Sequence, residues 1–167
     1  EITLSPHIGA HADAPLHYQN DAAAIGAVSL EPFLGPCRVI HAIDCGPLIT
    51  TDHLAHAALN LPPRVLVRTA KHAAQHWWTD DFSAYAPQTI EWLAERGVML
   101  IGLDTASIDP ASSKTLDSHH TILRHDMRVL ENLVLDDVPE GDYELIALPL
   151  ALVQADASPV RAVLREL

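Results

Sequence analysis

Short apolar runs alternate with amphipathic segments along most of the chain. Four runs rich in Val, Ile or Leu are bounded by Gly, Pro or Asp, and several are apolar on both faces, which is typical of strands covered on both sides. These predicted strands are residues 37–44, 64–69, 98–104 and 143–150. Amphipathic segments between and after them predict helices over residues 52–59, 87–96, 120–130 and 159–167. The alternation predicts a mixed α/β fold with one sheet-based core.

Helix-end signals support this reading. Thr50 and Thr51 suit an N-cap, Pro87 suits a first helical turn, and Ser158 with Pro159 resembles an N-cap followed by the first residue of a last helix. No internal repeat, low-complexity tract or linker divides the sequence. We therefore expect residues 1–167 to form one domain.

Charge and cysteine content narrow the class of protein. The formal net charge is −12 and no basic cluster occurs, so we expect neither a nucleic-acid nor an anionic-membrane partner. No apolar run reaches the roughly 18 residues of a membrane span. The two cysteines, Cys37 and Cys45, match no zinc or redox spacing, which favours a reducing, cytoplasmic setting. Eleven histidines raise the expectation of metal or proton chemistry.

Metal-ligand residue types concentrate in one segment near the start, SPHIGAHADAPLHY, residues 5–18. His7, His11, Asp13 and His17 are all odd-numbered, so an extended chain would point them to one face. His7 and His17 would then lie about 33 Å apart, too far for one site, unless the chain bends between them. Imidazole and carboxylate without thiolate suit Zn²⁺ or Mn²⁺, and further ligands are expected downstream.

Two other interpretations of this segment are open. In a helix, His7 and His11 would pair four residues apart as in zincins, but Gly9 and Pro15 disfavour a helix and the zincin glutamate is absent. Alternatively, the segment is a histidine-rich loop that binds nothing. We favour a strand that runs into a tight loop, with Gly9 and Pro15 permitting the bends.

The motif HIGAHADAPLH closely resembles the H-x-G-T-H-x-D-x-P-x-H signature of the cyclase family of metal hydrolases. The resemblance continues through SIDPASSKTLDSHH, VLENLVLDDVPEGDYELIALPL and DASPVRAVL, and so covers nearly the whole chain. Ala10 replaces the signature threonine, at a position that is not a ligand. The resemblance also leads us to expect that the N-terminal segment of the family, with part of the substrate pocket, lies outside the given residues.

The resemblance implies the swivelling β/β/α fold of this family and a centre of two divalent metal ions. Zn²⁺ is the expected ion and Mn²⁺ the alternative. Asp13 matches a ligand that bridges both ions, and His17 matches a histidine that transfers protons in catalysis. The full ligand set implied is His7, His11, Asp13, His119 and Glu131.

His119 and Glu131 can bind the same cluster only if the chain between them is not one continuous helix. Twelve residues of continuous helix would separate His119 from Glu131 by about 18 Å, too far for one cluster. If both are ligands, we expect His119 to precede the predicted helix, with Asp117 or Ser118 as its N-cap, and the chain to turn back before Glu131. Without the resemblance, Glu131 is equally well read as a solvated helix residue.

Within the family, the chain is most similar to the bacterial kynurenine formamidases, or arylformamidases. This likeness implies a homodimeric enzyme of tryptophan catabolism that hydrolyses a small molecule, N-formyl-L-kynurenine, to formate and L-kynurenine. A sibling hydrolase acting on isatin or another cyclic amide or ester is the first alternative, and a metal-binding module without turnover is the second.

Two expectations concern other residues. We expect His120 to orient a ligand or the substrate, and we expect Trp77, Trp78 and Phe82 to belong to the core.

Overall fold

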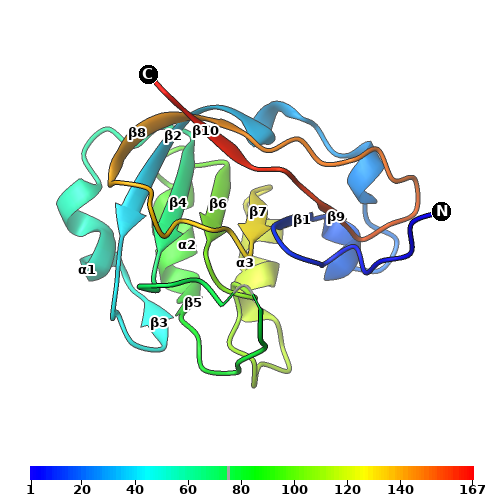
Figure 1. Cartoon of the computed structure of the whole chain (residues 1–167), viewed down its shortest axis with the longest axis horizontal. Coiled ribbons are helices and arrows are strands. Elements are labelled where there is room, and N and C mark those ends of the chain that lie inside the picture. Colours follow the sequence, from blue (N-terminus) through cyan, green and yellow to red (C-terminus); the bar gives the residue numbers. More distant parts are fainter. Residues whose placement is uncertain (75) are drawn as a thin grey trace.

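A mixed sheet of eight strands organises the chain (Figure 1). The computed structural model describes residues 1–74 and 76–167. Across the sheet the strand order is β10-β8-β2-β4-β6-β7-β1-β9, and β3 and β5 form a separate two-stranded sheet. The strands are β1 (His11–Asp13), β2 (Leu34–His41), β3 (Leu48–Ile49), β4 (Arg64–Arg68), β5 (Ala84–Tyr85), β6 (Leu100–Leu103), β7 (Arg128–Glu131), β8 (Gly141–Ile146), β9 (Ala157–Pro159) and β10 (Val163–Glu166).

The middle of the large sheet is parallel and its flanks are antiparallel. Strands β2, β4, β6 and β7 run in one direction, as expected for neighbours connected by crossovers. On one flank β1 pairs antiparallel with β7 and with β9. The register places His11 opposite Glu131 on one side of β1 and opposite Pro159 on the other, so residues near the start of the sequence lie between two strands from its second half.

Helices cover one face of this sheet. They are α1 (Thr51–Leu54), α2 (Pro87–Ala94) and α3 (Asp117–Arg124), and α2 packs against α3. Their buried residues share a core with alternate residues of the parallel strands, such as Val65, Val67 and Ile101. The other face is covered by the chain segments around Ile25 and Phe33 and by the segment after β7. Because both faces are covered, β4 and β6 are apolar almost throughout.

The four predicted strands are present, with shifted ends, as β2, β4, β6 and β8. The helix predicted over residues 52–59 is a single α-helical turn followed by a 3₁₀ turn at Ala55–Ala57, and the one over residues 87–96 is α2. The helix predicted over residues 159–167 is wrong, because Ser158 pairs with Ala12 in β9 and the chain continues into β10. Edge pairing to distant strands overrides the local N-cap pattern there.

The helix predicted over residues 120–130 is also wrong in its second half. Helix α3 ends at Arg124, Asp126 adopts a left-handed conformation with φ of 51°, and the chain reverses into β7. Val129 and Leu130 are buried between β6 and β1, which explains their apolar character without a helix. None of the helices in the described part of the chain has the length and apolar character needed to cross a lipid bilayer.

Candidate metal centre

The histidine-rich segment folds as a short strand between two bends, as the sequence predicted. Gly9 has a φ of 59°, a conformation that favours glycine, and β1 follows at once. Pro15 begins a 3₁₀ turn that ends at His17. These bends bring His7 and His17 together, with ring centroids 4.4 Å apart.

Asp13 lies at the middle of the cluster and is fully buried. Its Oδ1 lies 3.0 Å from His7 Nδ1 and 3.4 Å from His11 Nε2. Its Oδ2 lies 3.3 Å from His119 Nε2 and 3.9 Å from His17 Nε2. One carboxylate therefore faces all four histidines.

Glu131, at the end of β7, completes the buried part of the cluster. Its Oε2 lies 3.3 Å from His11 Nε2 and its Oε1 lies 3.5 Å from His119 Nε2. The Ile108 backbone N–H donates to Glu131 Oε1 at 2.8 Å and fixes the carboxylate. Glu131 is thus a buried strand residue, and the alternative of a solvated helix residue is wrong.

His119 reaches the cluster from within α3, not from a position before the helix as expected. It is the third residue of α3, and the reversal at Asp126 brings β7 back alongside it. The N-cap position is held by Leu116, so the expectation of Asp117 or Ser118 there is wrong. The condition that the chain turn back before Glu131 is met.

Two groups of side chains are close enough to share an ion each. One consists of His11, Asp13 and Glu131, and the other of His7, Asp13 and His17, with ligand atoms within 4.8 Å of one another in each group. Among the described residues, His11 Nε2 and Asp13 Oδ1 are buried without a hydrogen-bond partner. Buried polar atoms are rarely left so, and a cation between them would satisfy both.

The buried carboxylates and histidines of the cluster shift one another's pKa values. Burial opposes charge on His11, but Asp13 and Glu131 outweigh it and raise the pKa of His11 to about 10. The pKa of His119 is likewise raised well above its usual value, against burial, by Asp109, Asp13 and Glu131. Burial also opposes charge on Asp13, yet the surrounding histidines hold its pKa well below its usual value. The cluster therefore attracts positive charge, which a divalent ion supplies.

Asp109 is a further residue of the site that sequence reasoning missed. Its Oδ2 accepts hydrogen bonds from His119 Nδ1 at 2.7 Å and from the His119 backbone N–H at 3.0 Å, and its Oδ1 accepts from Ser118 N–H at 3.0 Å. The ring of His119 is thereby fixed with Nε2 directed at Asp13 and Glu131. His11 is oriented similarly, since its Nδ1 lies 2.9 Å from the Gly9 carbonyl oxygen. Such partners are usual for metal-binding histidines.

Asp156, just before β9, is the second missed residue. Its Oδ2 lies 3.1 Å from His17 Nδ1 and 3.3 Å from His7 Nε2. Burial opposes its charge, but the hydrogen bonds to His17 and His7 lower the pKa of Asp156. Both Asp109 and Asp156 lie in segments that carried the family resemblance, and this was the available signal.

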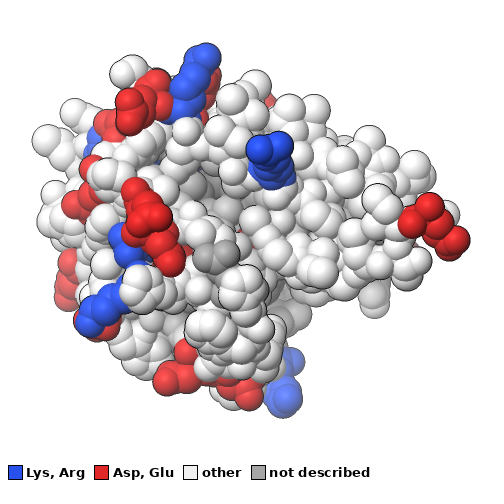
Figure 2. All heavy atoms as spheres, in the orientation of Figure 1, with Lys and Arg blue, Asp and Glu red and all other residues white. Residues whose placement is uncertain are grey.

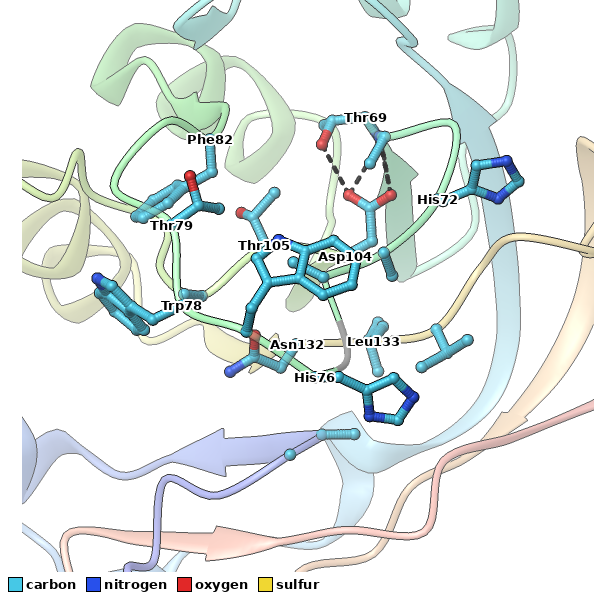
Figure 3. A pocket seen from close by; sticks show the side chains of 18 of the residues that line it. Thr69, His72, His76, Trp78, Thr79, Phe82, Asp104, Thr105, Asn132 and Leu133 are labelled. Atoms are coloured by element: carbon cyan, nitrogen blue, oxygen red, sulfur yellow. Dashed lines mark hydrogen bonds between the residues drawn. The ribbon is translucent and has the colours of Figure 1, made fainter.

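A cavity of about 700 Å³ adjoins the cluster, because His7 is among the residues that line it. Figure 3 shows this pocket from close by, with Trp78 and Phe82 among its lining side chains. Trp77, Trp78 and Phe82 line it, so the expectation that these aromatic residues belong to the core is wrong. Trp77 and Trp78 are 64% and 72% exposed. His120 is exposed on α3, which contradicts its expected role in orienting a ligand or substrate.

Comparisons with known proteins agree with this fold and site. The Cyclase family model ("Putative cyclase") matches residues 1–110. The kynurenine formamidase of Bordetella pertussis is 87% identical over 167 residues, which are 100% of this chain and 80% of that protein.

Two solved structures are also similar. A structure described as a potential metal-dependent hydrolase with cyclase activity is 30% identical, with a TM-score of 0.88 over 98% of this chain and 81% of that chain. Isatin hydrolase A from Ralstonia solanacearum is 26% identical, with a TM-score of 0.77 over 97% of this chain and 73% of that chain. The β/β/α fold and the family expected from the motif are thus confirmed, and the chain belongs to the cyclase family of metal-dependent hydrolases.

Proposed function

We propose that this chain is an arylformamidase that hydrolyses N-formyl-L-kynurenine to L-kynurenine and formate. The observation that carries the proposal is the buried cluster centred on Asp13, with unpartnered ligand atoms beside a cavity large enough for a substrate. The 87% identity to a kynurenine formamidase along the whole chain supports this substrate. We further propose that residues 1–167 act as a single metal-hydrolase domain.

The proposed ligands are the five residues that the sequence motif suggested. His11, Asp13, Glu131 and His119 would hold one ion, and His7 with Asp13 would hold the other. Imidazole and carboxylate donors suit Zn²⁺, with Mn²⁺ as the alternative. Two bound ions supply Lewis acidity toward the formyl oxygen and lower the pKa of a water molecule toward neutrality.

His17 is the proposed proton-transfer group. The arylamine nitrogen leaves poorly as an anion, so a proton must reach it as the amide bond breaks. His17 Nδ1 is paired with Asp156, which leaves Nε2 to face the cluster, where it lies 3.9 Å from Asp13 Oδ2. The side chain of His17 is 30% exposed, so it is more accessible to a substrate than the buried His11 and His119. This arrangement of an oriented histidine supports a role in moving protons.

The geometry also leaves a competing role for His17, because it lies close enough to His7 and Asp13 to bind an ion with them. A metal analysis of variants separates the two roles.

Four finer features belong to the same proposal. We propose two bound ions with zinc as the physiological metal, a homodimer, a cytoplasmic location and a place in tryptophan catabolism. The free thiols of Cys37 and Cys45 fit a reducing compartment. Light scattering of the purified protein tests the dimer, and metal analysis tests the ion count.

The decisive experiment combines metal content with turnover. We expect the purified protein to contain about two divalent ions per chain and to release formate from N-formyl-L-kynurenine. Chelation should abolish both, and added Zn²⁺ or Mn²⁺ should restore them. Turnover that persists after complete chelation would contradict the proposal.

One alternative is favoured by a specific observation. The likeness to isatin hydrolase A raises the lactam of isatin as a substrate. Isatin and N-formyl-L-kynurenine should therefore be assayed side by side. A higher kcat/KM for isatin would replace the proposed substrate while leaving the metal chemistry intact.

A further inference from the structure

The cavity beside the cluster has one wall made by a single connecting segment between β4 and β5. We call residues 70–74 and 76–82 the aromatic loop. Its Trp77, Trp78 and Phe82 line the cavity, and so does His7 from the cluster. In Figure 3, Trp78, Thr79 and Phe82 lie together on one side of the pocket and His72 lies on the other. The wall and the proposed reaction centre therefore share one space.

The aromatic side chains are arranged for contact with a flat ring. Trp78 and Phe82 pack edge to face, with centroids 6.5 Å apart and an angle of 80° between the rings. Trp78 Nε1 donates to Asp80 Oδ1 at 2.6 Å, so the polar atom of the indole is already satisfied. Trp77 and Trp78 line the cavity and are largely exposed, so they present apolar surface that a ligand can cover.

The charges on the residues that line the cavity also favour an uncharged aromatic ligand. Among the described residues lining the cavity there is no lysine or arginine, while Asp81 and Asp104 carry carboxylates. Figure 2 shows acidic and basic side chains scattered over one face, with mostly uncharged residues between them. The cavity therefore suits an uncharged aromatic ring better than an anionic one.

Two consecutive residues after β6 hold the two ends of the aromatic loop. At its start, the buried Asp104 accepts hydrogen bonds from the backbone N–H groups of Thr69 and Ala70, at 3.0 Å each, and from Thr69 Oγ1 at 2.7 Å (Figure 3). At its end, Thr105 Oγ1 donates to the carbonyl oxygen of Ser83 at 2.9 Å. The rigid end of a buried strand thus sets where the loop lies.

We propose that the aromatic loop is the substrate-selecting element of this hydrolase, with Trp77, Trp78 and Phe82 binding the aryl ring. Asp104 and Thr105 are positioning residues that hold this wall at a fixed distance from the cluster. The inference deepens the proposed function and rests on it for the identity of the ring.

The first test truncates the wall. In Trp77→Ala and Trp78→Ala, we expect KM for N-formyl-L-kynurenine and the calorimetric Kd of L-kynurenine to rise about 10-fold, with kcat within about twofold of the parent. Trp92→Phe is the control, because Trp92 lies on α2, packed against Arg96, and does not line the cavity. Unchanged KM and Kd in both alanine variants would overturn the inference.

The second test loosens the anchor. Asp104→Asn replaces one acceptor oxygen by a donor, and Thr105→Val removes the bond to Ser83 while nearly keeping volume. In both variants we expect the fold-increase in KM to be about ten times the fold-decrease in kcat. Asp142→Asn, at a surface pair with Arg38, is the matched control. If Asp104→Asn fails to fold, Thr105→Val alone tests the positioning role. A lower kcat with an unchanged KM in the folded variants would overturn that role.

Formanilide separates failure of the inference from failure of the proposed function, because it keeps only the ring and the formamide. Turnover of formanilide without turnover of N-formyl-L-kynurenine would contradict the proposed substrate. A KM for formanilide raised by the tryptophan variants would still support the ring site. A KM for formanilide that those variants leave unchanged would refute it.

Discussion

Asp109 accepts a hydrogen bond from His119, so a substitution at Asp109 tests whether this contact orients His119 as a metal ligand. The change to test is Asp109→Asn, which nearly keeps the volume of the side chain and removes its charge. Asp109 now accepts three hydrogen bonds with two oxygens, one of them from His119 Nδ1. An asparagine has one acceptor oxygen, and its NH₂ group must face a backbone N–H or the His119 ring.

The expected magnitude follows from these contacts. A buried N–H left without an acceptor costs about 1–3 kcal/mol, so the free energy of unfolding of the metal-free protein should fall by roughly that amount. If the NH₂ group faces His119 Nδ1, the ring must carry its proton on Nε2, the atom directed at Asp13 and Glu131. Metal affinity should then fall about 10- to 100-fold, as is typical when a partner of a ligating histidine is lost.

Two measurements check this expectation. Denaturant unfolding of the chelated protein gives the stability change, and competition with a chromophoric chelator gives the metal affinity. Asp142→Asn serves as control, since Asp142 pairs with Arg38 at the surface. Metal affinity within about twofold of the parent, in a folded Asp109→Asn variant, would refute the claim that Asp109 orients a ligand.

Three further outcomes follow from the same cluster. His17→Ala should lower kcat about 10²–10⁴-fold with metal content retained, whereas Asp13→Ala should lose metal and activity together; loss of metal in His17→Ala would make His17 a ligand. Asp156→Asn should lower kcat about 10-fold or more, because His17 loses its oriented partner, and a pH–rate profile identical to the parent's, with unchanged kcat, would contradict this. The pKa of His11 is raised from 6.5 to about 10 in the folded metal-free protein, so its stabilising contribution is complete below pH 6.5 and is lost as pH rises through about 10. Denaturant unfolding of the chelated protein between pH 6.5 and 10 should show this fall, and a His11→Asn variant should show a smaller one.

The part of the site that could be predicted from sequence is the part that is local. His7, His11, Asp13 and His17 lie within eleven residues, and Gly9 and Pro15 mark the bends between them. The metal-ligand residue types and the bends that bring them together can therefore both be recognised in this one segment of the sequence. The buried strands could be predicted for the same reason, since each is an apolar run whose burial does not depend on the identity of its neighbours.

The errors arise where a distant partner decides the local structure. Ile122, Met127 and Leu130 continue a helical pattern across a turn, yet Leu130 pairs with Ala12 in the sheet. Asp109 and Asp156 resemble ordinary loop carboxylates until the fold places them beside His119 and His17. Trp77 and Trp78 have core-like side chains, and no local signal shows that they line an open cavity.

The histidines of the cluster also explain how its carboxylates are tolerated in a buried position before any ion binds. Asp13 and Glu131 lie within 3.5 Å of histidine nitrogens and raise the pKa values of His11 and His119, so these carboxylates favour the protonated form of both rings in the metal-free protein. Imidazolium groups then balance the carboxylates that a divalent ion would otherwise balance. Metal binding must therefore release protons, so affinity should increase with pH across the range in which the histidines lose them. Because β1 pairs with β7, a bound ion would join His11 and Asp13 of β1 to Glu131 of β7 through side chains, as the sheet already joins these strands through their backbones.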